Sequence, residues 1–194
     1  MSSKQKKNIA IFASGTGTNA ANIIRYFSEK RTAQIALIVS NNPTAGVLKI
    51  AEENNISTLL LQKEKFFRGD AYVPELQHAA IDFIVLAGFL WKLPSALINA
   101  YRDNIINIHP ALLPKYGGKG MYGNFVHEAV LSTKEKESGI TIHFADEFYD
   151  NGKIIFQTTC PVYENDTSET LAKRIHELEY KYFPVVIEEV IAKL

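Results

Sequence analysis

Apolar segments alternate with helical patterns through the first half of the chain. Short, mostly apolar segments predict strands, and the stretches between them carry the spacing of amphipathic helices. Strands that are apolar on both faces and alternate with helices are typical of a parallel sheet covered on both sides. We therefore predict a doubly wound, Rossmann-like α/β fold with a mostly parallel sheet. The predicted strands are 8–13, 34–40, 57–61 and 83–87. Three helices are predicted between them: one that follows the first loop and ends near residue 28, one at 44–54 and one at 73–80.

The second half departs from this alternation. A loop at 110–123 is rich in Gly and Pro and long enough to predict a functional role. No internal repeat or linker interrupts the sequence, so we expect one domain over 1–194 with a phosphate-binding half at 1–100 and a second half at 101–194. The other predicted elements are a strand at 105–109, a helix at 125–131, antiparallel strands at 139–144 and 154–162, and a last helix from Asp166 or Thr167 with a kink at Pro184.

Charge and cysteine content narrow the class of protein. The 194 residues carry 21 basic and 21 acidic side chains, so no overall field would attract nucleic acid or an anionic membrane. The one basic cluster, Lys4, Lys6 and Lys7, precedes the first strand and is expected to be solvated. The single cysteine, Cys160, allows no disulfide within the chain. No apolar run approaches the length of a membrane span and the first residues lack an apolar stretch, so we expect neither a transmembrane segment nor a signal peptide. We expect a cytoplasmic protein with no membrane or nucleic-acid partner.

A polar pair stands at the end of the strand at 105–109. Alternation places Asn107 and His109 on one face, about 6.6 Å apart, and Pro110 and Pro114 stiffen the loop that follows. An amide and an imidazole in this position suit an oxyanion donor and a proton shuttle. The residues alone favour the simpler alternative, a hydrogen-bonded polar pair at the edge of a sheet.

A glycine-containing loop joins the first strand to the first helix. Gly15 and Gly17 allow backbone N–H groups to approach an anion at a helix N-terminus. A dinucleotide site also requires an acidic residue after the second strand, where this chain has Ser40, Asn41 and Asn42. The loop therefore favours a phosphate monoester over a nicotinamide cofactor, and a tight turn without a ligand is the alternative.

An acidic loop, 146–152, follows the strand at 139–144. A carboxylate from this loop, placed near His109, would raise the pKa of the imidazole to neutrality or above. The alternative is a solvated hairpin turn. The five histidines include His143, which either supports the site or is structural, and we predict His78, His127 and His176 to lie at the surface. None has metal-ligand spacing, so no metal site is expected.

The segment 88–94 leaves the central strand at 83–87 with aromatic and aliphatic residues. Ligands of open α/β sheets bind outside the carboxyl ends of strands, so this loop could hold a flat heterocycle. The alternative, equally well supported, is that these apolar residues pack in the core and that a helix starts at Pro94.

Taken together, these motifs resemble the phosphoribosylglycinamide formyltransferase family of purine biosynthesis, from Ile9 to about Ile187. The resemblance implies transfer of a formyl group from 10-formyltetrahydrofolate, a co-substrate, to the amine of phosphoribosylglycinamide, without a metal or a covalent enzyme intermediate. The motifs are Ser14-Gly-Thr-Gly-Thr-Asn19, Val85-Leu-Ala-Gly-Phe89, Asn107-Ile-His-Pro-Ala-Leu-Leu-Pro114, and Gly139-Ile-Thr-Ile-His-Phe144 running into Asp150-Asn-Gly152.

The family pattern assigns roles to individual residues, and it makes 101–194 the catalytic and folate-binding half. Asn107 would donate to the tetrahedral oxyanion, His109 would share this role and move a proton, and Asp150 would keep His109 charged and oriented. The substrate contacts that the resemblance implies are Gly17, Thr18, Asn19 and Glu179, and the folate contacts are Leu90, Trp91, Lys92, Leu93, Asn107 and, one place from the family's arginine, Arg68. Trp91 and Lys92 depart from the commoner Arg followed by an aliphatic, and Asn151 replaces a frequent glycine, where Asn tolerates a left-handed turn.

Three other readings compete with this one. A formyltetrahydrofolate deformylase shares the catalytic residues but usually has an N-terminal regulatory domain, whereas this catalytic unit begins by Asn8. Methionyl-tRNA formyltransferase usually has a C-terminal RNA-binding domain and net positive charge. A phosphoribosyl-binding module would need only the glycine loop. We expect a formyltransferase that acts on small molecules as a monomer or weak homodimer.

Overall fold

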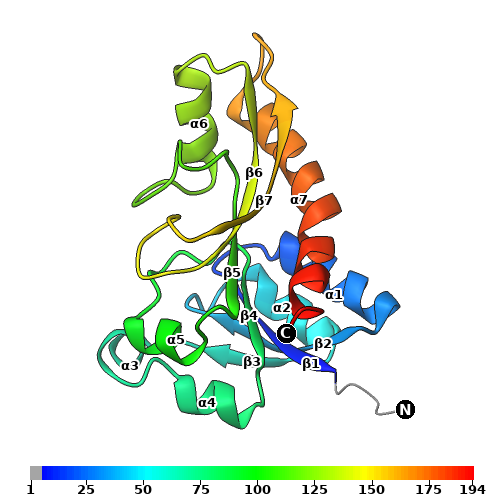
Figure 1. Cartoon of the computed structure of the whole chain (residues 1–194), viewed down its shortest axis with the longest axis vertical. Coiled ribbons are helices and arrows are strands. Elements are labelled where there is room, and N and C mark those ends of the chain that lie inside the picture. The colour runs from blue at the N-terminus through cyan, green and yellow to red at the C-terminus, as the bar shows by residue number, and fades with distance from the viewer. Residues whose placement is uncertain (1–5) are drawn as a thin grey trace.

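Seven strands of the computed structural model, which describes residues 6–194, form one sheet (Figure 1). They are β1 (Lys7–Phe12), β2 (Ala33–Ser40), β3 (Ser57–Leu60), β4 (Phe83–Leu86), β5 (Ile105–His109), β6 (Glu137–Phe144) and β7 (Ile154–Pro161). Their order is β3-β2-β1-β4-β5-β6-β7. Strands β1 to β5 are parallel, and β6 runs antiparallel to both β5 and β7. The predicted doubly wound, mostly parallel sheet with antiparallel strands in the C-terminal half is confirmed.

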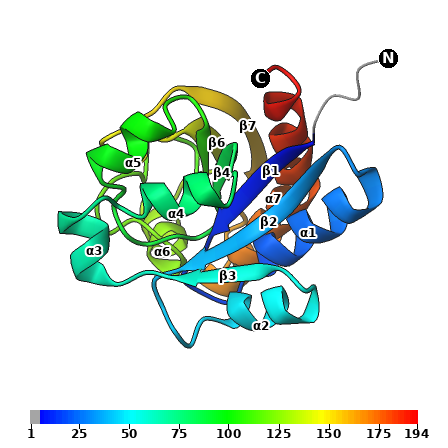
Figure 2. The same ribbon diagram turned by 90° about the horizontal axis from the view of Figure 1, so that it is seen from below.

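Helices cover both faces of this sheet (Figure 2). They are α1 (Thr18–Lys30), α2 (Gly46–Glu53), α3 (Lys63–Arg68), α4 (Val73–His78), α5 (Ser95–Ala100), α6 (Asn124–Ser132) and α7 (Ser168–Ile191). The core against α1, α2 and α7 is separate from the core against α3, α4 and α5. Alternation within β1 supplies both, since Ile9 and Ile11 pack on one face and Ala10 and Phe12 on the other.

Two helices show what the hydrophobic pattern can and cannot predict. The predicted start of the last helix is confirmed, since Thr167 is the N-cap of α7 and forms a capping box with Thr170. The helix continues past Pro184 to Ile191. Helix α3 was not predicted, because Phe66 is its only buried residue and six residues give too short a pattern.

The sheet order changes direction beside β1, because β2 and β3 lie on one side of it and β4 on the other. The chain leaves β1 and β4 at the same edge, where the Ser14 N–H donates to Gly88 O at 3.0 Å. Such a point is where open α/β sheets bind ligands. Of the predicted basic cluster, Lys4 lies outside the described residues and Lys6 is exposed, whereas Lys7 is the first residue of β1 and half-buried, so it does not precede the strand as predicted. No helix within 6–194 is long and apolar enough to cross a membrane.

Candidate functional site

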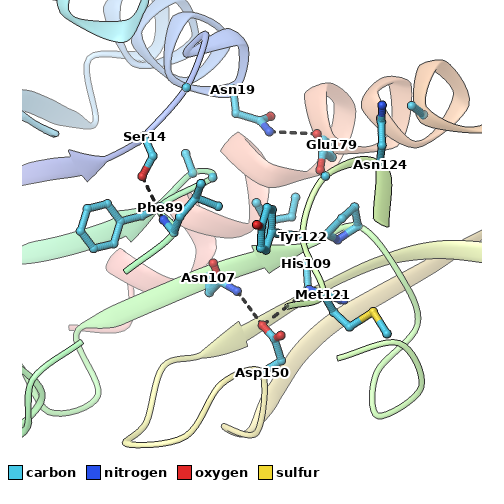
Figure 3. A pocket seen from close by; sticks show the side chains of 18 of the residues that line it. Ser14, Asn19, Phe89, Asn107, His109, Met121, Tyr122, Asn124, Asp150 and Glu179 are labelled. Atoms are coloured by element: carbon cyan, nitrogen blue, oxygen red, sulfur yellow. Dashed lines mark hydrogen bonds and ion pairs between the residues drawn. The ribbon is translucent and has the colours of Figure 1, made fainter. Parts of the chain in front are cut away.

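A cavity of about 680 Å³ opens at the carboxyl ends of β1, β4 and β5 (Figure 3). Its walls come from the loops after these strands, the segment 118–124, the acidic loop and helices α6 and α7. Its volume falls within the range of small-molecule sites, about 300–1,000 Å³. The polar side chains in its lining include Ser14, Thr16, Thr18, Asn19, Asn107, His109, Lys119, Asn124, His127, Asp150, His176 and Glu179.

Three side chains of the predicted catalytic set meet at one end of this cavity. The His109 Nδ1 atom lies 3.5 Å from Asp150 Oδ1, and the Asn107 Nδ2 atom lies 3.4 Å from the same oxygen (Figure 3). His109 is 3% exposed, whereas Asn107 is half-buried at the cavity wall. Because β5 delivers two of these groups and the loop before β7 delivers the third, the sheet itself holds them together.

The protonation of His109 differs from the prediction. Burial lowers the pKa of His109, and it outweighs the Asp150 charge and the Tyr116 carbonyl, which raise it. The expectation that the carboxylate would bring this pKa to neutrality or above is therefore wrong. Burial also acts to raise the pKa of Asp150, but the contacts with His143, His109 and Gly118 N–H together lower it, so that Asp150 is charged.

His143 supports the site by orienting the amide of Asn107. Its Nδ1 atom is 2.8 Å from Phe144 O, so Nδ1 must carry the proton, since a carbonyl only accepts. In the neutral ring Nε2 then accepts from Asn107 Nδ2 at 3.0 Å. The amide nitrogen of Asn107 is therefore directed toward His143 and Asp150, and its oxygen points away from Asp150 (Figure 3).

The loop after β1 has the geometry of an anion site. Gly17 has φ +81°, and a Cβ there would lie 2.7 Å from Val47 Cβ, so this position requires glycine. The Ala21 N–H donates to Gly17 O at 2.8 Å, so the N–H groups of Thr18 and Asn19 precede the ladder of helix α1. Such N–H groups and the helix dipole favour an anion.

Glu179, which the resemblance implies to be a substrate contact, lies at the other end of the cavity. It is 4% exposed and accepts from Asn19 Nδ2 at 2.9 Å and from His176 Nδ1 at 2.8 Å. The hydrogen bond to Glu179 raises the pKa of His176. The segments that meet here lie 160 positions apart in the sequence.

His127 corrects another prediction. It is 2% exposed rather than at the surface, because α6 packs on α7 and turns His127 into the cavity wall. Burial lowers its pKa to about 4, so the ring is neutral near pH 7. Its Nδ1 and Asn19 Oδ1 are buried without a hydrogen-bond partner within residues 6–194. His78 and His176 lie at the surface as predicted.

The residues proposed for folate occupy different places. Leu90 lines the cavity and is 47% exposed, whereas Trp91 packs against Phe66, Phe67 and Phe89 outside the lining. Leu93 is buried in the core, and Lys92 Nζ lies 5.8 Å from the ring centre of Phe148. Arg68 is 78% exposed and pairs with Glu64 on α3.

Other features of the site were not predicted. The left-handed residue of the acidic loop is Asp150, with φ 52°, rather than Asn151. Tyr122 lines the cavity and stands between its two ends in the close view (Figure 3). The pairing of Asn107 with His143 follows from the β5–β6 register, which strand alternation would predict only once these two strands were known to be neighbours. Within residues 6–194, no group of three or more His, Cys, Asp or Glu side chains is arranged to hold a metal ion.

Comparison with known proteins agrees with the resemblance. The family model described as "Formyl transferase" matches residues 7–187. Phosphoribosylglycinamide formyltransferase of Bacillus subtilis is 35% identical, with 95% of each chain covered. The chloroplastic enzymes of that name from Arabidopsis thaliana and Vigna unguiculata are 40% and 39% identical, and this chain spans 65% and 61% of their lengths. The crystal structure of phosphoribosylglycinamide formyltransferase from Bacillus halodurans superposes with a TM-score of 0.88 at 34% identity, covering 96% of both chains.

Proposed function

This chain belongs to the formyl transferase family, and we propose that it transfers the formyl group of 10-formyltetrahydrofolate to the amine of 5'-phosphoribosylglycinamide. The products are 5'-phosphoribosyl-N-formylglycinamide and tetrahydrofolate, in purine biosynthesis. The observation that carries the proposal is the meeting of Asn107, His109 and Asp150 at one wall of a cavity whose other end offers an anion site. A simple binding module would need only the anion site.

The ribonucleotide fits the end of the cavity at α1 and α7. Its phosphate would accept from the N–H groups at Gly17, Thr18 and Asn19, as a helix N-terminus provides. Its ribose hydroxyls would reach Glu179 and Asn19, since Asn19 Oδ1 has no partner within the described residues. The glycinamide amine then lies toward Asn107 and His109.

The folate would lie along the exit loop of β4. Phe89 and Leu90 form an apolar wall on this side, and Met121 and Tyr122 line the cavity as well. We retain Trp91, Lys92 and Leu93 as residues that shape this wall, since Trp91 packs behind Phe89 with ring centres 6.4 Å apart. Arg68, exposed and paired with Glu64, is the weakest member of the proposed set.

The chemistry requires one bond to form and one to break. The amine attacks the formyl carbon directly and forms the new N–C bond, and the bond from this carbon to the folate nitrogen breaks. One proton leaves the amine and one reaches the folate nitrogen, so that no net proton is consumed. His109 would carry this proton through Nδ1, and Asp150, 3.5 Å from Nδ1, would favour the imidazolium.

Asn107 would stabilise the oxyanion by donating from its amide nitrogen. Of its two contacts, the one to His143 Nε2 measures 3.0 Å and the one to Asp150 Oδ1 measures 3.4 Å. Because the longer contact is the weaker one, its hydrogen is the one that a developing oxyanion can attract.

The direct experiment follows tetrahydrofolate formation with purified protein, 10-formyltetrahydrofolate and phosphoribosylglycinamide. We expect turnover that depends on the ribonucleotide and survives EDTA. Turnover that ignores the ribonucleotide would contradict the proposal and indicate a deformylase, and no turnover of either kind would indicate a binding protein.

The same assay tests the role of His109. We expect His109→Ala to lower kcat by about 10²-fold to 10⁴-fold, the usual contribution of a general acid or base. Far-UV circular dichroism should remain that of the wild type. A folded variant with a near-normal rate would remove His109 from the mechanism.

A further inference from the structure

One short backbone segment, Tyr116–Gly118, contacts both members of the His109–Asp150 pair. The Tyr116 carbonyl is 2.8 Å from His109 Nε2, and the Gly118 N–H donates to Asp150 Oδ2 at 2.9 Å. We propose that this segment is a positioning element that fixes the tautomer of His109 and the distance between the two side chains. Its effect on rate rests on the proposed function.

The carbonyl determines which nitrogen of His109 carries a proton. A carbonyl oxygen only accepts hydrogen bonds, so Nε2 must donate to Tyr116 O. In the neutral ring the lone pair is then on Nδ1, the nitrogen that lies 3.5 Å from Asp150 Oδ1. Proton exchange is thereby confined to the side of the ring that faces the carboxylate.

The position of this carbonyl depends on a side-chain anchor at the protein surface. Tyr116 has φ 57°, a conformation that a residue with a side chain rarely adopts without support. Its hydroxyl is 2.5 Å from Thr133 Oγ1 and donates to Glu135 Oε1 at 2.9 Å. Lys115 bonds to the same Glu135 oxygen at 2.8 Å. The hydrogen bonds from Lys115 and then Tyr116 lower the pKa of Glu135, which keeps this anchor charged.

The residue between the two contacts has no room for a side chain. A Cβ at Gly117 would lie 2.5 Å from Leu113 Cδ2 and 3.1 Å from Asp150 Cβ. Any side chain here would push against the carboxylate that the next residue binds. The glycine therefore allows the segment to approach Asp150 closely enough for the Gly118 N–H to donate.

The test uses Tyr116→Phe in the full chain, because this change keeps the ring and removes only the anchoring hydroxyl. We expect kcat to fall about fivefold, the factor that corresponds to one net hydrogen bond, with KM nearly unchanged. The Tyr116 carbonyl raises the pKa of His109, so a looser contact should move the His109 limb of the pH–rate profile to lower pH. The other charged or titratable groups acting on His109 are Asp150, His143, Glu179 and His127, and they are unchanged in this variant.

A second readout is independent of substrate. Imidazole ¹⁵N NMR of the wild type should show His109 protonated at Nε2, and Tyr116→Phe should show a mixture of tautomers. Tyr163→Phe is the matched control, since Tyr163 is 58% exposed and is not among the residues that line the cavity. It should change neither the rate nor the spectrum.

Two results would overturn the proposal. One is a Tyr116→Phe protein with the wild-type rate, pH profile and tautomer. The other is a loss of rate without a change of profile or tautomer, which would indicate loop packing only.

A second variant tests the close approach at Gly117. Gly117→Ala should lower kcat about 10²-fold, as expected for a displacement near 1 Å. Because the NMR measurement needs no turnover, failure of the proposed reaction would leave this test valid.

Discussion

Burial and neighbouring polar groups have opposite effects on the pKa of His109. Burial favours the neutral ring, while Asp150 at 3.5 Å and the Tyr116 carbonyl favour the imidazolium, and burial is the larger effect. In the proposed reaction the neutral ring would accept a proton, and Asp150 would favour the imidazolium until the proton is passed on. The placement of Asp150 therefore sets how far the pKa of His109 falls.

Asp150→Asn tests this balance. The neutral amide removes a charge that raises the pKa of His109, so this pKa should fall further and the His109 limb of the pH–rate profile should move to lower pH. We expect kcat to fall roughly 10²-fold. Glu147→Gln removes a charge from the same loop at a residue outside the cavity lining and should leave the profile unchanged. An unchanged profile in Asp150→Asn would reduce Asp150 to a turn residue.

At the scale of an element, the start of helix α7 combines one feature that the sequence predicts with one that only the structure shows. Its cap, Thr167, is readable from the sequence, and Asp166 adds a contact that the sequence does not reveal. Arg174, two turns along the helix, bonds both carboxylate oxygens of Asp166 at 2.9 Å. These hydrogen bonds hold the pKa of Asp166 well below its usual range.

Asp166→Asn should therefore lower stability in a pH-dependent way. The folded pKa lies below the unfolded value of about 3.9, so the stabilisation is present above this value and is lost as the pH falls through the folded pKa. We expect a loss of about 1 kcal/mol at pH 7, or a Tm lower by roughly 2–4 °C.

The difference in Tm from the wild type should shrink once the pH falls below about 4, toward the folded pKa. Glu164→Gln is the control, because this substitution of an exposed residue removes the same charge from the same segment. Equal effects of both changes at pH 7 would show that net charge, rather than the Asp166–Arg174 contact, is responsible.

At the scale of the whole molecule, the cavity depends on segments distant in the sequence. Asn19 from α1 and Glu179 from α7 meet across it, and β5 and the acidic loop close its other end (Figure 3). A ligand that spans these elements links the start of the sheet to the last helix. Binding should therefore stabilise the whole fold.

Thermal unfolding with phosphoribosylglycinamide measures this effect. At a ligand concentration about 100 times Kd, we expect a stabilisation of about 2.7 kcal/mol, or an increase in Tm of roughly 5–10 °C. Glu179→Gln should reduce this increase, because it weakens the contact proposed for the ribose. Glu177→Gln, a change at an exposed residue of the same helix, should retain the full increase. Equal increases in both variants would place the ribose elsewhere.

The sequence alone determined the strands, most helices, the fold class and the residue types at the carboxyl edge of the sheet. Ile106 and Ile108 must face opposite to Asn107 and His109, because strand alternation depends only on backbone geometry between neighbouring residues. The glycine loop can be predicted for the same reason, since the left-handed backbone conformation that favours glycine at position 17 is a local property of the chain.

Only the tertiary structure decided which groups meet and how they are charged. His127 has the sequence surroundings of a surface residue, yet packing of α6 on α7 buries it and lowers its pKa to about 4. The pKa of His109 likewise depends on burial and on Asp150, 41 positions away; Asp150 raises this pKa as predicted, but burial outweighs it and reverses the net direction. Periodicity describes one element at a time, whereas solvent exclusion and charge depend on every element that packs around a group.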